Sequence, residues 1–335
     1  MLARRLGSAL LVLLGASVIT FVLARVVPSD PSLAYMGPKA TAADAAKIRT
    51  TLGLDQPLPL QYLKYLRDMV RGDWGYSLST KQPVLQEILS RLPATLELIA
   101  AAIGFASVVG ILLGIVAARH RGSFRDGLIR FISIAGVSMP AFWLGLLLQL
   151  LFVGRFHWLP ATGEFDPNIK FIHPIHRITG FPIFDSFITG NFNAFGNGLV
   201  HLILPALTLS AYSLGLVSRM SRANLLEVLS QDYIKVARAY GLPEKVILFK
   251  LALRNALPPI VTVIGLSSAY LLTGTFFVEQ VYNWPGIGNF AANSLLSVDY
   301  PAIMGITLLG ATGYLTINLI VDLIQAKLDP RVSIS

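Results

Sequence analysis

The hydrophobic positions of this chain gather into six long runs, at about residues 6–27, 94–118, 129–153, 199–218, 257–278 and 301–326. The hydrocarbon core of a bilayer is about 30 Å thick, and a helix crosses it in about 20 apolar residues. Each run reaches that length, so the pattern predicts six transmembrane helices. The expected fold class is an all-α polytopic membrane protein.

The composition supports the same class. Hydrophobic residues make up 54% of the 335 positions and charged residues 13%, and the mean hydropathy is +0.64. A soluble domain carries about 25% charged residues, so a water-soluble enzyme and a disordered chain are both excluded. The chain has no cysteine, which excludes a disulfide framework, a thiolate nucleophile and a cysteine-ligated metal.

The first run follows Arg4 and Arg5 and could also open a signal peptide. It is longer than the 7–15 residues of a typical signal-peptide core, and its small residues lie inside the run rather than after it. We therefore expect residues 1–27 to hold the N-terminal end and an uncleaved first span.

The basic residues predict the orientation of the spans. Lys and Arg are frequent in 119–128 and 219–256 and at Lys327, whereas 279–300 contains none. Cytoplasmic loops carry the excess of positive charge, so both termini are expected to be cytoplasmic. The net charge of +9 is then a topology signal, and no nucleic-acid partner is expected. Residues 28–93 are then expected to form an extracytoplasmic segment, and 94–335 the membrane core with spans two to six.

Two parts outside the membrane are predicted to have structure of their own. Residues 42–54 and 58–71 show the apolar spacing of short amphipathic helices. Residues 154–198 are rich in Gly, Pro, Asn and aromatic residues with little periodicity, which is typical of a capping loop or a small irregular insertion. The role of 164–197 stays open.

The centres of all six runs lack Asp, Glu, Lys and Arg. An ion-coupled secondary carrier more often has such a residue near the midplane, so that class is disfavoured. Four prolines, Pro140, Pro205, Pro258 and Pro259, lie in or beside spans. They either kink the wall of a pathway or are ordinary prolines tolerated in membrane helices.

Gly110 and Gly114 have the spacing that lets two membrane helices approach closely. Packing within the chain is the favoured interpretation, with a dimer face as the alternative.

No catalytic, metal or cofactor site is expected. A P-loop needs a Gly-rich turn followed by Lys and Ser or Thr, and the chain has no such run. His173 and His176 lie three apart in a loop but lack a third ligand, so they are interpreted as loop residues. Any driving force from ATP must then come from another protein.

The loop between the fourth and fifth runs carries the most information. Asp232 can cap a short helix whose apolar side holds Ile234, Ala237 and Tyr240, and Gly241 can end that helix in a left-handed conformation. Pro243 and Glu244 suit the start of a second helix. Such a corner suits docking on a soluble partner. The alternative is a basic loop on anionic lipid, since 219–256 has seven basic and three acidic residues, a net +4.

This loop resembles the cytoplasmic EAA loop of binding-protein-dependent ABC importer permeases, in particular the oligopeptide/dipeptide/nickel group. That group reads close to D-Y-x-x-x-A-R-A-x-G-L and later L-R-N-A-L before a proline, as residues 232–242 and 253–258 do. Lys235 stands where the general pattern has Glu. Further segments resemble the family in the same order, at 28–31, 52–57, 72–75, 91–95, 139–142, 159–163, 284–288 and 328–331.

The resemblance implies a first-permease (B-type) subunit of the type I ABC importer fold in a bacterial plasma membrane. Its partners would be a second homologous permease, two ABC ATPases or one fused ATPase, and an extracytoplasmic binding protein. ATP and Mg would be used by those ATPases and not by this chain. Peptides are the expected cargo, with nickel, glutathione or another small solute as alternatives. A secondary carrier and a membrane scaffold are more distant alternatives for the function.

The resemblance also implies site residues. The ATPase would dock on the 232–245 loop, at Asp232, Tyr233, Ala237, Arg238, Ala239, Gly241, Leu242 and Glu244. Ala237 would allow close approach and Arg238 a charge contact. The segments 28–93 and 279–300 would receive the binding protein, with Tyr282, Trp284, Pro285 and Gly286 as candidate contacts. The aromatic pair could equally anchor in the membrane interface.

Overall fold

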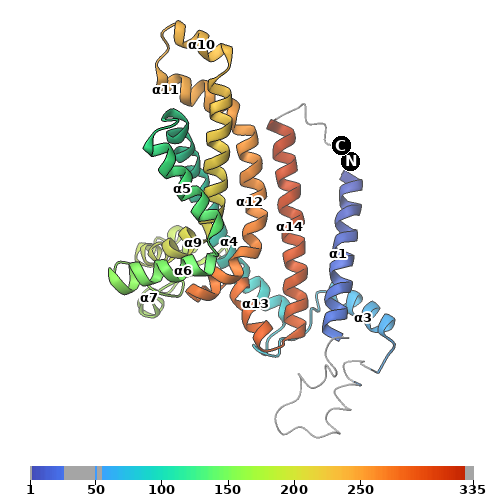
Figure 1. The fold of residues 1–335 in the computed structure, drawn as a ribbon. Coiled ribbons are helices and arrows are strands. Elements are labelled where there is room, and N and C mark those ends of the chain that lie inside the picture. Colours follow the sequence, from blue (N-terminus) through green and yellow to red (C-terminus); the bar gives the residue numbers. More distant parts are fainter. Residues whose placement is uncertain (1, 26–49, 51–54, 329–335) are drawn as a thin grey trace. The chain divides into compact units, whose positions relative to one another are not determined.

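The structure is a computed structural model that describes residues 2–25, 50 and 55–328 (Figure 1). The described chain is helical, with one isolated β-bridge between Tyr76 and Pro83. The helices are α1 (Leu2–Arg25), α3 (Leu58–Val70), α4 (Val84–Arg119), α5 (Phe124–Ser138), α6 (Ala141–Leu148), α7 (Pro167–Ile172), α8 (Pro182–Ile188), α9 (Phe192–Leu229), α10 (Asp232–Ala239), α11 (Glu244–Val246), α12 (Leu253–Tyr282), α13 (Ile287–Leu296) and α14 (Tyr300–Leu328). Two π-helical segments, η2 (Gln149–Arg155) and η3 (Ile247–Ala252), continue α6 and precede α12.

Five helical stretches of the described chain are long and apolar enough to cross a membrane, at Gly7–Ala24, Val84–Arg119, Phe192–Leu229, Glu244–Leu272 and Tyr300–Ile324. A sixth span is possible if α5 and the α6–η2 helix count as one. These two helices are bent by 113° at a short break. The prediction of about six spans is therefore confirmed, but the third is not the continuous helix expected over 129–153.

Pro140 explains the break. A proline disfavours helical geometry in the residue before it, and Met139 is extended at φ −80° and ψ 132°. Pro140 itself has ψ 132° and becomes the N-cap of α6. By contrast, Pro205, Pro258 and Pro259 lie inside α9 and α12, which continue through them.

The amphipathic helix expected over 58–71 is confirmed as α3. The one expected over 42–54 lies outside the described residues.

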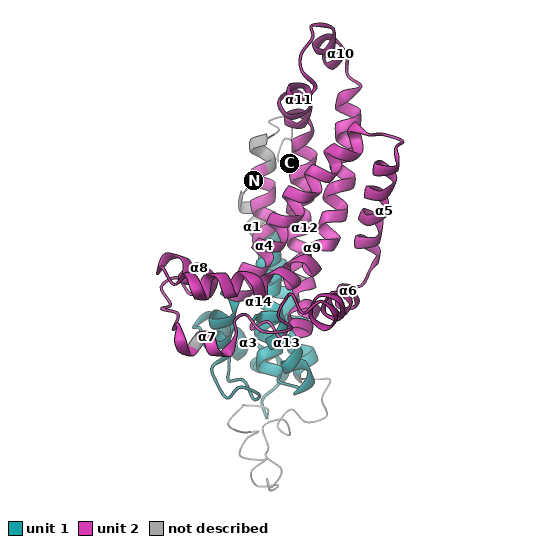
Figure 2. Ribbon diagram, turned by 90° about the vertical axis from the view of Figure 1, so that its left-hand side faces the viewer, with its two compact units in different colours: residues 1–93, 286–315 teal, residues 94–285, 316–335 magenta. Residues whose placement is uncertain are grey.

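The chain divides into two compact units (Figure 2). Unit 1 comprises Met1–Pro93 with Gly286–Leu315, and unit 2 comprises Ala94–Pro285 with Thr316–Ser335. Unit 1 has an apolar core around Val84, Ile88 and Phe290. Unit 2 has one core around Leu98, Leu204 and Leu271 and another around Leu225, Ile234 and Ile260.

Glycines let the helices of unit 2 approach closely. A Cβ at Gly114 would lie 2.3 Å from Ser221 Cβ, and one at Gly110 would lie 2.9 Å from Val217 Cγ1. Both neighbours are on α9, so the packing role expected within the chain is confirmed for this glycine pair. On the other side of α9, a Cβ at Gly215 would lie 2.4 Å from the carbonyl oxygen of Ser133 on α5.

Candidate functional site

The α10 corner lies at one end of the long helices α9 and α12 (Figure 1). Helix α10 begins at Asp232, but its N-cap is Gln231, and no side chain caps it. Asp232 therefore stands in the first turn rather than at the cap position expected for it. Gly241 has φ +75° and its N–H donates to Arg238 O at 2.9 Å. The left-handed stop predicted for Gly241 is confirmed, and Pro243 directly precedes α11.

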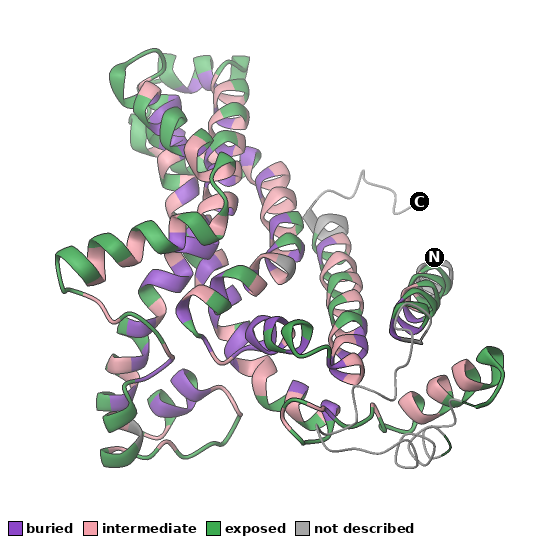
Figure 3. Ribbon diagram, turned by 60° about the horizontal axis from the view of Figure 1, so that its bottom comes forward, coloured by how far each residue is buried: buried purple, intermediate pink, exposed green. Residues whose placement is uncertain are grey.

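Helix α10 has two apolar faces. Ile234 and Ala237 are 0% and 8% exposed and pack in the core that also contains Leu225 and Ile247. The opposite side carries Val236 and Tyr240, which are 52% and 83% exposed. Figure 3 shows how buried and exposed positions are distributed along the helices. Sequence reasoning placed Tyr240 with the inner residues and did not single out Val236. The outer face is thus an uncovered apolar patch outside the spans.

Most of the residues predicted for ATPase docking are accessible. Asp232, Tyr233, Arg238, Ala239, Gly241, Leu242 and Glu244 are exposed, whereas Ala237 is buried in the chain's own core. Polar contacts fix their geometry. Arg238 Nε donates to Glu244 Oε1 at 2.8 Å across the corner, and Asn255 Nδ2 donates to Tyr233 Oη at 2.8 Å.

An ion pair with a buried carboxylate joins α5 to α9. Arg222 donates from Nε and Nη2 to the two carboxylate oxygens of Asp126, at 2.7 and 2.8 Å. Asp126 is 1% exposed and also accepts from the N–H of Gly122 at 3.0 Å. Bidentate pairs of this kind fix orientation as well as distance, so α5 and α9 are held together about two turns before the end of α9.

The aromatic pair Tyr282 and Trp284 lies differently from what the sequence suggested. The two side chains are 1% and 0% exposed. Tyr282 Oη lies 2.9 Å from Thr208 Oγ1, and Trp284 Nε1 donates to Ala94 O at 2.9 Å. Both rings are therefore covered by other residues of this chain. Pro285 is half-buried and Gly286 buried.

Several of the family-like segments meet around these two rings in unit 2. The N–H of Gly163 donates to Tyr282 O at 2.8 Å, and Gln149 Nε2 donates to Ala161 O at 2.8 Å and to Val281 O at 3.2 Å. Thr95 Oγ1 donates to Glu279 Oε1 at 2.7 Å, with both groups buried. These contacts bring the segments together at the C-terminal end of α12.

The segment 164–197, which had no sequence pattern, is organised by two acids. Glu97 Oε1 on α4 accepts the N–H groups of Ile183 and Phe184 in the first turn of α8, at 3.1 and 3.0 Å. Asp185, fully buried, accepts from the N–H groups of Ile178, Thr179 and Gly180 and from the Thr179 hydroxyl, at 2.6–3.1 Å. Burial alone would raise the pKa of the Asp185 carboxyl, but these four donors together hold it below its ordinary value.

Replacing Asp185 with asparagine should therefore loosen residues 178–180. Asparagine keeps the shape but offers one acceptor oxygen in place of two, and an unmet buried donor costs about 1–3 kcal/mol. We expect amide hydrogen exchange at 178–180 to quicken about tenfold or more. The pKa of Asp185 is lower in the folded state than in the unfolded state. Its carboxylate therefore stabilises the fold fully above the ordinary aspartate pKa of about 3.9, and this stabilisation is lost only as the pH falls below that value.

The matched control is Asp166→Asn, because the Asp166 side chain is 54% exposed. Equal amide hydrogen-exchange rates at residues 178–180 in Asp185→Asn and in Asp166→Asn would contradict the prediction.

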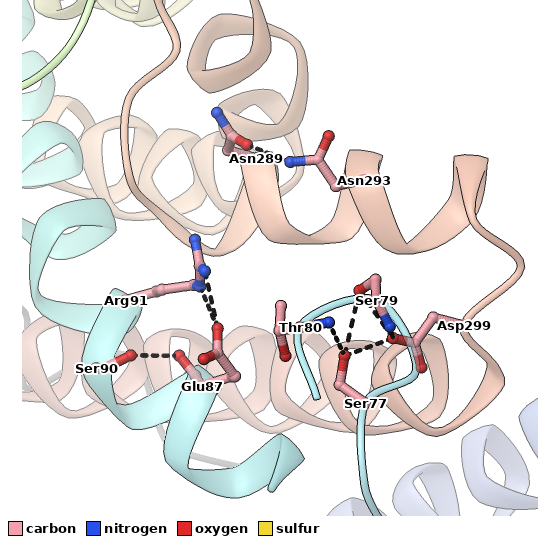
Figure 4. Close-up of polar contacts among 9 residues, drawn as sticks. All are labelled: Ser77, Ser79, Thr80, Glu87, Ser90, Arg91, Asn289, Asn293 and Asp299. Carbon is pink, nitrogen blue, oxygen red and sulfur yellow. Dashed lines mark hydrogen bonds and ion pairs between the residues drawn. The ribbon is translucent and has the colours of Figure 1, made fainter. Parts of the chain in front are cut away.

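A buried carboxylate in unit 1, that of Asp299, joins the two segments that were expected to receive a binding protein. Asp299 is 0% exposed and accepts from the Ser77 hydroxyl at 2.5 Å and from the Ser79 N–H and hydroxyl at 3.0 and 2.9 Å (Figure 4). Nearby, Arg91 pairs with Glu87 at 2.8 Å and lies over the Phe290 ring. Asp299 could not be singled out from the sequence, because Ser77 and Ser79 are 220 positions or more away.

The Asp299 contacts hold a strained, apolar turn. Val298 has φ +54°, which is an outlier for a β-branched residue. Leu295, Leu296 and Val298 are 54%, 81% and 46% exposed. Strain of this kind persists only where the surroundings over-determine the backbone, so the turn presents its apolar side chains in one fixed conformation.

The described residues contain no group of three His, Cys, Asp or Glu side chains that could hold a metal ion. His173 Nε2 lies 3.3 Å from Asn193 Nδ2, and His176 is exposed.

Comparisons with known proteins cover nearly the whole chain. The family model "Binding-protein-dependent transport system inner membrane component" matches residues 110–334, and the model of the N-terminal part of such membrane components matches residues 1–99. A probable D,D-dipeptide transport system permease protein of Escherichia coli (strain K12) is 43% identical over 331 residues, which is 99% of this chain and 96% of the relative. A di/tripeptide transport system permease protein of Pseudomonas aeruginosa (strain UCBPP-PA14) is 40% identical over 332 residues, 99% of this chain and 98% of the relative.

Among solved structures, an inward-facing methionine ABC transporter matches with a TM-score of 0.54 and 16% identity, covering 73% of this chain and 97% of that one. At that identity the likeness concerns the fold alone.

Proposed function

This chain belongs to the family of binding-protein-dependent transport system inner membrane components, and from that premise we propose that it is the permease subunit of an ATP-driven peptide importer. It is a multi-span membrane protein with the type I ABC importer permease fold, as the sequence predicted. The observation that carries the cargo assignment is the full-length similarity, at about 40% identity, to permeases of dipeptide and di/tripeptide transport systems.

The proposal divides the work between this chain and its partners. The permease forms part of the membrane pathway, a second permease forms the rest, and cytoplasmic ATPases supply the free energy. An extracytoplasmic binding protein delivers the peptide. The basic loops around 119–128 and 219–256 support an orientation with both termini cytoplasmic, which places α10 on the side of the ATPases.

The α10 corner is proposed as the ATPase contact. Its inner face, Ile234 and Ala237, fixes the helix to this chain, while Tyr233, Val236 and Tyr240 on the outer face enter a groove on the ATPase. Arg238 and Glu244 hold the two sides of the corner together, so movement of α10 is passed to η3 and α12. An apolar patch outside the membrane is typical of a protein contact.

Replacing both Val236 and Tyr240 with serine should uncouple the transporter. Both side chains are exposed, so the stability of the chain should change by less than about 0.5 kcal/mol per site. We expect ATPase co-purification and peptide uptake to fall at least about tenfold, because truncating interface anchors costs about 2 kcal/mol or more.

The control is Phe171→Ser, which removes an aromatic side chain that is 87% exposed on α7, away from the corner. Normal uptake by the double variant, at normal expression, would rule out α10 as the contact.

The strained turn of unit 1 is proposed as part of the surface that receives the binding protein. It joins the segments 28–93 and 279–300 through Asp299, and Leu295, Leu296 and Val298 are its exposed apolar residues. A preformed loop loses little conformational entropy on binding, which suits repeated docking of a soluble carrier.

The function is tested by tagging the chain, purifying it in mild detergent from its native membrane, and identifying the proteins that accompany it. P-loop ATPases, a second six-span permease and a binding protein are the expected companions. Radiolabelled dialanine should then enter proteoliposomes only with ATP and the binding protein. A chain that purified alone and moved solute without ATP would return the secondary carrier to first place.

A further inference from the structure

Unit 2 contains an open cavity of about 510 Å³ beside the break between α5 and α6. Its walls come from four helices: the end of α5, the start of α6, the middle of α9 and the C-terminal half of α12. Ligand sites for small molecules have volumes of about 300–1,000 Å³, so the cavity is large enough for a side chain together with part of a peptide backbone. Neither the α10 corner nor the unit 1 turn includes any of its lining residues.

The break between α5 and α6 argues against lipid in this cavity. Helix α5 has 15 residues and so spans about 22 Å of a hydrocarbon core about 30 Å thick. The helix therefore ends before the far side of the core. The chain is exposed there, at the helix end Ser138 and at the non-helical Met139 and Pro140. Non-helical backbone within the membrane occurs only where protein covers it or where it lines a water-filled space. The break lies in the cavity wall, which favours the water-filled space.

The lining is aromatic and uncharged. Tyr212 and Tyr270 pack with their ring centroids 4.5 Å apart, and Phe142 and Phe277 with theirs 6.1 Å apart. Tyr270 and Phe277 are each about half exposed, at 52% and 53%. Among the described residues that line the cavity, none is Asp, Glu, Lys, Arg or His. Aromatic faces attract apolar and aromatic groups, and the absence of fixed charge gives no preference for a charged side chain.

We infer that this cavity is a cargo subsite on the translocation path, where an uncharged side chain of the transported peptide lies against Tyr270 and Phe277. The inference rests on the proposed peptide cargo and adds to it the residues of this chain that touch the peptide. Its consequence is a size preference: the cavity accepts large apolar side chains, and narrowing it should discriminate against them.

Gly274 gives a way to narrow the cavity. It is one of the lining residues, and a Cβ there would meet Leu209 Cδ1 at an ordinary 3.5 Å. In the reconstituted complex we expect Gly274→Phe to reduce ATP-dependent uptake of diphenylalanine at least tenfold while dialanine uptake stays within twofold. The matched control is Gly104→Phe on α4, where a Cβ would meet nothing within 4 Å. It should leave both peptides unaffected.

Unchanged uptake of both peptides by Gly274→Phe, or an equal loss of both, would overturn the subsite. A wild-type complex that imported neither peptide would instead refute the proposed cargo, so the two failures are distinguishable.

Thiol labelling tests the cavity without relying on transport. Because the chain has no cysteine, Gly274→Cys introduces its only thiol. We expect a charged, water-soluble methanethiosulfonate reagent to modify this cysteine in the assembled complex. It should leave Leu112→Cys unmodified, because Leu112 is a 49% exposed apolar position on the spanning helix α4. Failure to label position 274 would mean that lipid or the second permease fills the cavity, and the inference would be wrong.

Discussion

Replacing Gly114 with leucine is expected to abolish accumulation of the folded permease. A Cβ at this position would lie 2.3 Å from Ser221 Cβ and 3.0 Å from two backbone atoms of α9, Arg222 N and Ser218 O. Backbone atoms of a helix cannot move aside as a side-chain end can, so α9 would have to separate from α4. Overpacking costs about 1–3 kcal/mol and occasionally more, and here leucine adds further atoms beyond the Cβ. We expect the yield of monodisperse protein in detergent to fall at least about tenfold.

The control for this variant is Gly104→Leu on the same helix, where the added side chain meets open space. It should accumulate like the wild type. A Gly114→Leu protein with wild-type yield and thermal stability would mean that α4 and α9 are not in this close contact.

The sequence predicted most of the helices because hydrophobicity is a local property. It did not predict which proline would interrupt a span. Pro205, Pro258 and Pro259 stay inside continuous helices, as neighbouring groups in a membrane protein can allow, whereas a new helix begins after Pro140, bent by 113° from the last. The difference is set by what packs around each proline, which the sequence does not contain.

The α10 corner shows the same division between local and non-local information. Gly241 was predicted from turn chemistry and has the expected positive φ. The face of the helix was predicted less well. Ile234 and Tyr240 are six residues apart, which at about 100° per residue puts them about 120° apart around the helix. Steps of three therefore drift off one face, and Tyr240 is exposed while Ile234 is buried.

Contacts between distant segments could not be predicted. Asp299 meets Ser77 and Ser79 across more than 200 positions, and Trp284 donates to Ala94 O. The aromatic pair at 282 and 284 was predicted to lie on the surface because it falls in the extracytoplasmic segment 279–300. In the structure the left-handed Asn283 turns the chain at the end of α12 and directs both rings inward.

Breaking the Asp126–Arg222 pair should have the second large effect. Helix α9 comes close to α4 where Ser221 lies against Gly114, and the next residue of α9, Arg222, pairs with Asp126 of α5. Three helices are therefore held together near the C-terminal end of α9. Removing one member of a buried pair costs about 3–5 kcal/mol because the other charge is left unpaired. Arg222 keeps 22% of its side-chain surface exposed. Arg222→Met leaves the buried Asp126 carboxylate with only the Gly122 N–H at 3.0 Å and the exposed Arg130 at 3.8 Å, so it should be more destabilising than Asp126→Leu.

The two substitutions together separate stability from coupling. Since apolar residues of similar volume often replace a buried pair without loss, Asp126→Leu with Arg222→Met should recover most of the thermal stability lost by either alone. If the pair also transmits the movement of α10, the double variant should still hydrolyse ATP with its partners but import peptide at least about tenfold more slowly. The reason is that two apolar side chains in contact can slide past each other, whereas a bidentate ion pair fixes the relative orientation of α5 and α9. Normal uptake by a stable double variant would restrict the pair to a structural role, and a double variant no more stable than the singles would show that the two residues do not act as a pair.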